Sequence, residues 1–236
     1  ISFAAGGQCS PPAATQDLSV GTPIATVTAV NPLSPLLIHQ ATRISASVTV
    51  APPNVGIPTG TVMVALGTAS CSITLNNGSG DCELTPVASG SQTLSASYAG
   101  VTQFQPSNTS VDASVALNPS TFQVTSSANP STPGQAVSFT VAITGVAAAL
   151  TVSVSKALAV PTGTVTLSDG ATNLGSALLV DGSATISSPL LTALGNHSIV
   201  ANYSGDANFQ AAASTAFAQM VAVPVAPSAT PVPSLG

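Results

Sequence analysis

The segment Pro161-Thr-Gly-Thr-Val165 repeats, residue for residue, an earlier segment of the chain, Pro58-Thr-Gly-Thr-Val62. A longer pair keeps the same register, since Leu94-Ser-Ala-Ser-Tyr-Ala-Gly-Val-Thr-Gln-Phe104 corresponds to Ile199-Val-Ala-Asn-Tyr-Ser-Gly-Asp-Ala-Asn-Phe209. Self-similarity at a fixed spacing indicates a chain built from repeated structural units. We therefore expect two copies of one domain of roughly 100 residues, the usual size of a small β-sandwich.

Apolar and polar residues alternate upstream of the Pro-Thr-Gly of each copy. The apolar positions are Ile44, Ala46, Val48 and Val50 in the first copy, and Val137, Phe139, Val141 and Ile143 in the second. Alternation with period two predicts a strand with one buried face, and short strands between Gly, Pro, Asn and Asp turns predict a sandwich. No segment of useful length has the helical period of 3.6, so we expect an all-β chain with almost no helix.

Five segments of the second copy combine a turn glycine, a core tyrosine and a Gly-Asp loop. They are Pro161-Thr-Gly-Thr-Val-Thr-Leu-Ser-Asp-Gly170, Leu174-Gly175, Asp181-Gly-Ser-Ala-Thr185, Leu194-Gly-Asn-His197 and Ala201-Asn-Tyr-Ser-Gly-Asp-Ala-Asn-Phe209. These segments resemble the bacterial Ig-like repeat domains of large surface proteins, and the match covers nearly all of the second copy and most of the first. The first copy departs from the pattern at Ala99-Gly-Val-Thr102, which lacks the acid. The resemblance implies tandem immunoglobulin-like β-sandwiches that serve as a spacer, adhesive module or assembly unit, without catalytic residues.

We divide the chain into four parts on these grounds. The boundaries are an N-terminal arm at 1–20, a first Ig-like domain at 21–117, a second at 118–225 and a Pro-rich C-terminal tail at 226–236. The two copies meet around Leu117-Asn-Pro-Ser120, which is too short for a flexible tether. We therefore predict a stiff tandem rod with an extended arm at each end.

The second copy has ten additional residues before its Pro-Thr-Gly, within 145–160. They are mostly apolar, and we predict a hairpin that projects from the sandwich and contacts another molecule through Val146, Leu150 and Val152, because exposed apolar patches usually mark interaction sites. The alternative is that the hairpin folds back over its own sheet. The span Val141–Val160 is also long enough for a transmembrane helix, but its alternation from Leu150 onward favours strands, so we expect a chain that does not span a membrane.

The chain has three cysteines, Cys9, Cys71 and Cys82. The last two flank an Asn-Asn-Gly-Ser-Gly turn, and folding this segment as a hairpin brings them opposite each other, close enough for a disulfide. The alternative is a pair of buried free thiols. A disulfide indicates an exported protein, and the odd Cys9 is then a free thiol or an intermolecular contact.

Charged residues make up only 4% of the chain, whereas about 25% is usual. The two basic residues, Arg43 and Lys156, cannot form a phosphate-binding face, because that affinity grows with the number of Lys and Arg contacts. They are also too few for recruitment to anionic membranes. We therefore exclude nucleic acid as a partner.

The residues that could support catalysis or bind a metal are few and scattered. His39 and His197 lie in different copies, and neither has an acid nearby in the sequence, so we predict no catalytic triad. Asp169 and Asp181 precede glycines, where Asp is favoured for its turn-forming hydrogen bond, and Asp206 lies in a similar loop. Calcium prefers several oxygen ligands and zinc prefers clustered Cys and His, so we predict no metal site and no cofactor.

Two functions fit this chain better than an enzyme. The first is a self-assembling extracellular structural protein, a subunit of a bacterial surface filament or layer that associates with itself by strand addition and through the apolar hairpin. The second is an adhesin or spacer module at the cell surface that binds carbohydrate or host protein. Binding hot spots favour exposed Tyr, Trp and Arg, but the chain has no Trp and Tyr98 and Tyr203 point inward by alternation. Charged edge strands normally prevent association, and their scarcity here favours self-assembly.

Overall fold

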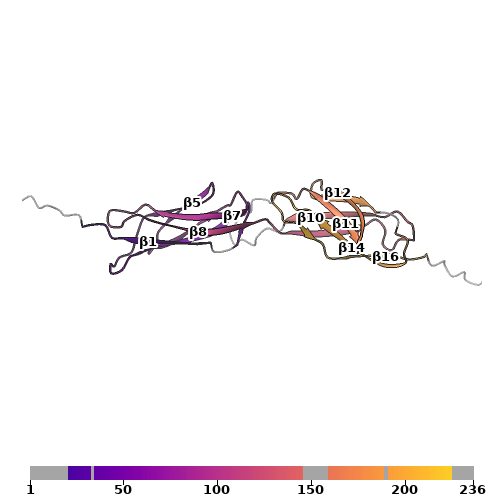
Figure 1. Cartoon of the computed structure of the whole chain (residues 1–236), viewed down its shortest axis with the longest axis horizontal. Coiled ribbons are helices and arrows are strands. Elements are labelled where there is room, and N and C mark those ends of the chain that lie inside the picture. The colour runs from indigo at the N-terminus through magenta and orange to yellow at the C-terminus, as the bar shows by residue number, and fades with distance from the viewer. Residues whose placement is uncertain (1–20, 33–34, 146–158, 189–190, 225–236) are drawn as a thin grey trace, which may run out of the picture.

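The computed structural model describes residues 21–32, 35–145, 159–188 and 191–224. Within these ranges the chain forms two β-sandwiches that lie end to end along the long axis of the molecule (Figure 1). The regular elements of this part of the chain are all strands. None of the described residues belongs to a helix that is long and apolar enough to cross a membrane.

The first sandwich packs a three-stranded sheet, in the order β1-β3-β6, against a five-stranded sheet, in the order β2-β8-β7-β4-β5. Its strands are β1 (Thr26–Pro32), β2 (Leu36–Leu37), β3 (Thr42–Val50), β4 (Thr61–Leu66), β5 (Ala69–Thr74), β6 (Ser79–Leu84), β7 (Gly90–Tyr98) and β8 (Ser107–Ala116). All pairings are antiparallel except that of β2 with β8. Hydroxyl hydrogen bonds from Thr26 and Thr28 to Ser107 join β1 to β8 along one side.

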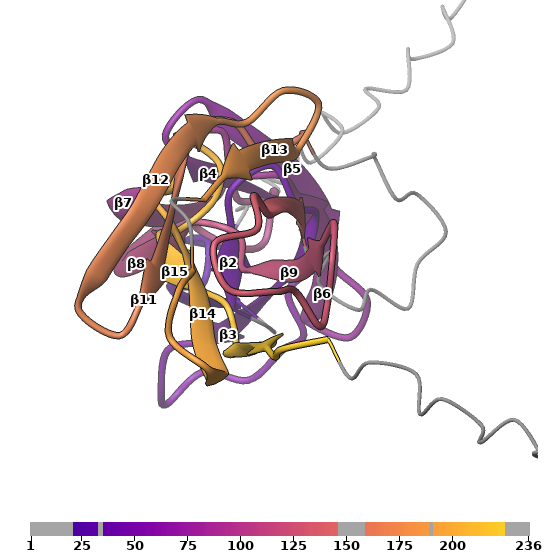
Figure 2. The ribbon, with the colours of Figure 1, turned by 90° about the vertical axis from the view of Figure 1, so that its right-hand side faces the viewer.

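The second sandwich repeats this arrangement. Its strands are β9 (Ser120–Ser126), β10 (Ser138–Gly145), β11 (Thr164–Asp169), β12 (Thr172–Leu178), β13 (Ser183–Ser187), β14 (Gly195–Tyr203), β15 (Ala212–Ala213) and β16 (Phe217–Val221). One sheet has the order β9-β10-β13, and the other has the order β12-β11-β14, with β15 and β16 both paired to β14. Seen along the long axis, β11, β12 and β14 lie on one side of the second sandwich, opposite β9 and β13 (Figure 2).

Each sandwich has its own hydrophobic core. The alternating residues predicted to face inward do so: Ile44 is fully buried in the first core, and Phe139 is fully buried in the second. Tyr98 and Tyr203 are also buried, at 1% and 3% exposure. The repeated Pro-Thr-Gly precedes β4 in one copy and β11 in the other, with both glycines in the left-handed region. At Gly163 a side chain would lie 2.8 Å from the Gly205 carbonyl oxygen, which explains why the turn uses glycine.

Two predictions concern residues outside the described ranges. The first is the pair of arms at 1–20 and 226–236. The second is the hairpin near 145–160, where the structure describes only Gly145, as the end of β10, and the residues from Ala159 onward. The prediction that strand continues from Val141 is correct as far as Gly145.

Candidate functional site

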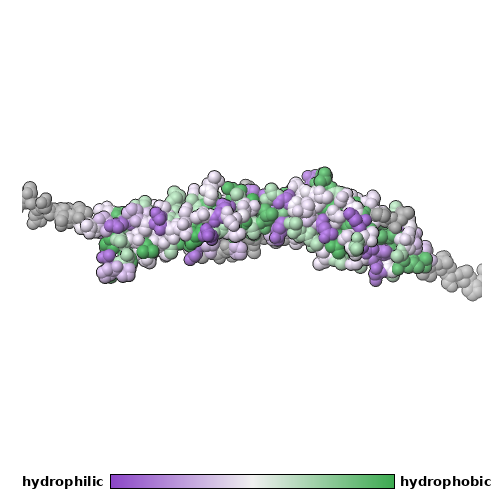
Figure 3. All heavy atoms as spheres, viewed as in Figure 1, coloured by the Kyte–Doolittle hydropathy of each residue, from purple (hydrophilic) through white to green (hydrophobic). Residues whose placement is uncertain are grey.

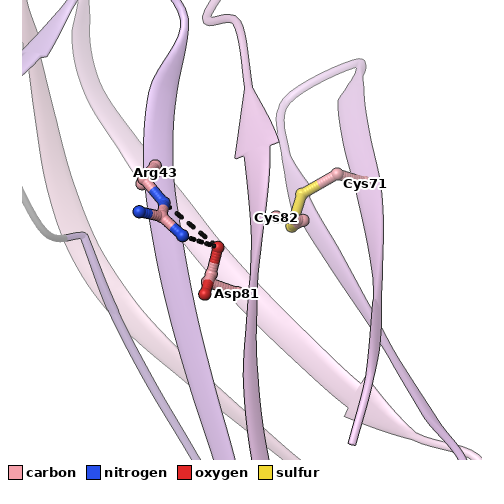
Figure 4. Close-up of a disulfide and its surroundings, with 4 residues drawn as sticks. All are labelled: Arg43, Cys71, Asp81 and Cys82. Atoms are coloured by element: carbon pink, nitrogen blue, oxygen red, sulfur yellow. Dashed lines mark hydrogen bonds and ion pairs between the residues drawn. A yellow bond between two sulfur atoms is a disulfide. The ribbon is translucent and has the colours of Figure 1, made fainter. Parts of the chain in front are cut away.

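The structure joins Cys71 to Cys82 in a disulfide, with the Cα atoms 6.1 Å apart (Figure 4). The pairing was predicted from a simple hairpin, and that reasoning is wrong. Cys71 lies on β5 and Cys82 on β6, which belong to opposite sheets. After a tight turn at Asn77-Gly78, where both residues have positive φ, the chain crosses from one sheet to the other. The disulfide therefore closes one open side of the sandwich.

The second sandwich fills the equivalent place without cysteines. Gly175 takes the place of Cys71, because it pairs with Leu167 as Cys71 pairs with Val64. Ile186 takes the place of Cys82, because it pairs with Phe139 as Cys82 pairs with Ile44. A side chain on Gly175 would lie 3.0 Å from the Ile186 methyl group. The isoleucine thus takes the space of the bridge, which shows that the disulfide is a local stabilising element of the first sandwich.

The other predicted contact residues are Cys9, Val146, Leu150 and Val152. All four lie outside the described residues, so their role in contacts between molecules stays a prediction.

His197 has an acidic neighbour that the sequence does not reveal. Its Nδ1 lies 2.5 Å from Asp169 Oδ2, and its Nε2 lies 2.9 Å from the Ala193 carbonyl oxygen. Asp169, at the end of β11, also accepts a bond from the Ser198 backbone N–H through Oδ1. The prediction of Asp169 as a turn residue therefore misses its main partner, because the pairing of β11 with β14 brings Asp169 next to His197.

This pair favours the protonated imidazole. Both ring nitrogens face acceptors, so the doubly protonated ring satisfies both. The bond to the Ala193 carbonyl and the bond to Asp169 raise the pKa of His197 above its usual value, and burial offsets this only in part. Because Nε2 is occupied by a carbonyl, the ring has no free nitrogen with which to activate a serine in this arrangement. In the first sandwich Gln92 takes the place of His197, and it donates a hydrogen bond to the carbonyl of Ala88.

The remaining candidate acids and bases lie apart from one another. His39 is exposed in a loop of the first sandwich, where its backbone N–H bonds the Pro86 carbonyl. Asp206 accepts bonds from the backbone and hydroxyl of Thr162 and from the Asn208 and Phe209 backbone. Burial alone raises the pKa of Asp206, but these bonds outweigh it and hold the pKa below its usual value.

Asp181 lies in the β12–β13 turn with positive φ, as the Asp-Gly pattern predicts. Among the described residues no three His, Cys, Asp or Glu side chains come together in a way that could hold a metal ion.

A cluster of buried polar groups lies at the joint between the two sandwiches. Asn118 is 1% exposed. Its Oδ1 accepts a 2.7 Å bond from Gln40 Nε2, and its Nδ2 donates to the carbonyl oxygens of Ile38 at 3.1 Å and Asn208 at 3.0 Å. Its backbone also bonds Asn208 and Gln210 at 2.8 and 3.1 Å. One side chain therefore connects the loop after β2 in the first sandwich to the loop after β14 in the second.

Sequence reasoning located this junction but missed the residue that organises it. The usable signal is the repeat itself. Asn118 pairs with Phe209 as Ile24 pairs with Phe104, both in parallel bridges. The second copy therefore has a polar residue where the first has an apolar one. A buried polar residue needs hydrogen-bond partners, and for Asn118 two of them, Gln40 and Ile38, come from the other sandwich.

Two β-sandwiches in tandem, with strand orders that repeat and a core tyrosine in each, define an array of immunoglobulin-like domains. The model of the bacterial Ig-like domain (group 3) family matches residues 10–116 and 124–222. The chain belongs to this family. No curated protein sequence matches the chain.

Several solved structures are remotely similar to this chain. The Escherichia coli adhesin FdeC is 15% identical, with coverage of 83% of this chain and 64% of that one and a TM-score of 0.34. The adhesin InvE of Yersinia pseudotuberculosis is 13% identical, with coverage of 80% and 58% and a TM-score of 0.35. Dimeric latent PorU of Porphyromonas gingivalis is 12% identical, with coverage of 81% and 20% and a TM-score of 0.30. The chain thus spans less than two thirds of each of these proteins, and similarity at this level has no bearing on function.

Proposed function

We propose that this chain is a non-enzymatic structural protein of the bacterial cell surface, in which two Ig-like domains form one stiff unit that assembles with further copies. The observation that supports this most directly is the joint at Asn118. Two side-chain hydrogen bonds from this buried residue of the second sandwich, with Gln40 and with the Ile38 carbonyl, hold the second sandwich to the first. A hinge between independent binding modules needs no such buried polar contact, whereas a rod does.

The surface of the chain supports association. Nine formal charges are spread over 236 residues, and hydrophilic residues are scattered over the visible face without forming a patch (Figure 3). Arg43, one of the two basic residues, is paired with Asp81 across β3 and β6 at 2.6 Å (Figure 4). Charged edge strands and a substantial net charge are the usual means of keeping domains apart. A protein that largely lacks both is suited to contact with its own copies.

The chemistry of the described residues supports a non-enzymatic role. His197 is bonded on both nitrogens. Asp206 accepts four hydrogen bonds, two from Thr162 and two from the backbone of its own loop. The disulfide supports export, because such bonds persist in oxidising compartments. We therefore place the protein outside the cell or on its surface.

An adhesin or spacer role is the alternative, with cell-surface glycans or proteins as partners. It has less support, because the aromatic and arginine side chains that dominate binding hot spots are engaged elsewhere. Tyr98 and Tyr203 are buried, and Arg43 pairs with Asp81. Strand addition by the arms and contacts through Val146, Leu150 and Val152 remain part of the proposal, as predictions from sequence.

Electron microscopy of the full chain, imaged over a rising range of protein concentrations, tests the proposal. We expect filaments or layers that grow with concentration. Single rods at every concentration, together with specific binding of the chain to glycans or host proteins, would favour the adhesin alternative.

A further inference from the structure

The two outer ends of the molecule correspond to the two halves of its own internal joint. In the joint, the C-terminal end of the first sandwich covers the N-terminal end of the second. The N-terminal end of the first sandwich and the C-terminal end of the second have no such cover from the described part of the chain. We call them the free N-terminal face (Ile24, Val55, Ile57, Val101 and Phe104) and the free C-terminal face (Pro133, Leu194 and Val223).

The free N-terminal face has the same backbone hydrogen bonds as the N-terminal end of the second sandwich, which the joint covers, but its surface is more apolar. Ile24 bonds the Gln103 carbonyl at 2.9 Å and the Gln105 N–H at 2.8 Å, as Asn118 bonds Asn208 and Gln210. Val55, Ile57 and Val101 are 85%, 60% and 39% exposed. A groove of about 630 Å³ runs between the segments that carry Ile24, Val55 and Phe104.

The sequence difference at Val101 is informative. Val101 occupies the position of Asp206, since each bonds the phenylalanine three residues on through its backbone. The first sandwich therefore has an apolar residue in place of the acid at the end that the second sandwich does not cover.

The free C-terminal face corresponds to the covering half of the joint. Leu36 pairs in parallel with Val115 as Ser131 pairs with Val221, so Ile38 and Gln40 correspond to Pro133 and Gln135. Ile38 and Gln40 are 5% and 7% exposed in the joint, whereas Pro133 and Gln135 are exposed.

This face is also apolar. Val223 and Leu194 are 63% and 62% exposed, and apolar atoms are visible at this end beside the C-terminal tail (Figure 3). Two apolar end faces on one rod are the arrangement that stacking of copies requires.

We propose that the free N-terminal face of one copy binds the free C-terminal face of a second copy, so that the rods join head to tail. This inference rests on the proposed function, since it specifies how the copies associate. Val223 and Ile24 belong to separate chains at this contact, and Ile24, which takes the place of Asn118, has no side-chain amide. The hydrogen bonds of Asn118 are therefore not repeated, and the contact is apolar.

A head-to-tail contact has a consequence for the shape of the assembly. It uses two different surfaces, so each added copy presents a new free face, and such a series forms an open filament unless the rotation closes a ring.

The test uses two substitutions that block opposite faces of the full chain. Val55→Asp blocks the N-terminal face at a side chain that is 85% exposed, so it is compatible with folding. Val223→Asp blocks the other face. In sedimentation velocity we expect each variant to need at least about tenfold more protein than the wild type to associate, because the contact would bury an unpaired carboxylate.

Mixing the two variants gives the sharpest result. The Val55→Asp copy keeps its C-terminal face and the Val223→Asp copy keeps its N-terminal face, so an equimolar mixture should form a dimer and nothing longer. Met63→Asp is the control, since Met63 is 52% exposed on a sheet face away from both ends and should associate like the wild type.

The outcomes separate this inference from the proposed function. If the wild type associates but both end variants do so equally well, and the mixture gives no dimer, the head-to-tail contact is wrong while assembly stands. If Met63→Asp alone abolishes association, the copies associate through their sheet faces, and the inference is again wrong. If the wild type remains monomeric throughout, the proposed function fails as well.

Discussion

Replacing Asn118 with alanine should turn the stiff rod into a hinged pair of sandwiches. The substitution removes three side-chain hydrogen bonds, from Gln40 and to the carbonyl oxygens of Ile38 and Asn208. It leaves both hydrophobic cores intact, because each core is built within its own sandwich. The effect should therefore appear in the relative motion of the two sandwiches before it appears in the stability of either.

The size of the effect follows from the number of bonds. Each buried hydrogen bond contributes about 1 kcal/mol net. Two of the three bonds, those with Gln40 and Ile38, cross the joint, so together they contribute about 2 kcal/mol to its closure. A coupling of about 2 kcal/mol corresponds to a change of about 30-fold in the ratio of closed to open joints. A joint that is almost always closed in the wild type should then be open in a substantial fraction of molecules.

Distances between spin labels on the two sandwiches measure this directly. Met63→Cys and Val180→Cys place labels at positions that are 52% and 70% exposed, with Cys9 changed to serine and the disulfide left oxidised. We expect one narrow distance distribution for this protein and a broad one when Asn118→Ala is added. Asn208→Ala is the matched control, since Asn208 joins these bonds through its backbone carbonyl. A distribution that stays narrow in Asn118→Ala would refute the assignment of the joint to this residue.

Three further predictions concern the separate sandwiches. Replacing Cys71 and Cys82 with Gly and Ile, the pair used by the second copy, should lower the stability of the first sandwich alone by up to about 3 kcal/mol, the chain-entropy value for a loop of this length; calorimetry that shows both transitions moving would contradict this. The raised pKa of His197 means that its stabilising contribution is present below pH 6.5, the usual pKa, and is lost as the pH rises through the folded pKa; denaturation of the second sandwich should show this loss in the wild type and not in His197→Gln. Gly163→Ala should cost at least about 3 kcal/mol, from left-handed strain of about 1–2 kcal/mol plus the close backbone contact, whereas Gly170→Ala, with open space around it, should cost only the strain; equal losses in chemical denaturation would argue against the contact.

The fold was largely predictable from sequence because its signals are local. The alternation around Ile44 and Phe139 fixes which face of each strand is buried, and the repeated Pro-Thr-Gly fixes the register of the two copies. Turn residues such as Asp181-Gly182 announce their own backbone geometry. Each of these features depends on a few neighbouring residues.

The contacts that were missed depend on which strands become neighbours in space. Asp169 and His197 are distant in sequence and meet only because β11 pairs with β14. The cysteines were paired correctly for the wrong reason, since no local pattern shows that β5 and β6 enter different sheets. Asn118 has a role only when both sandwiches are placed, because its partners come from each of them.

Sedimentation velocity of the wild-type chain over a rising series of concentrations tests the central claim most directly. Structural assembly through apolar ends predicts species that grow steadily in size as the concentration rises, and Val55→Asp should abolish this growth. A single species of 22.8 kDa at every concentration would contradict the account.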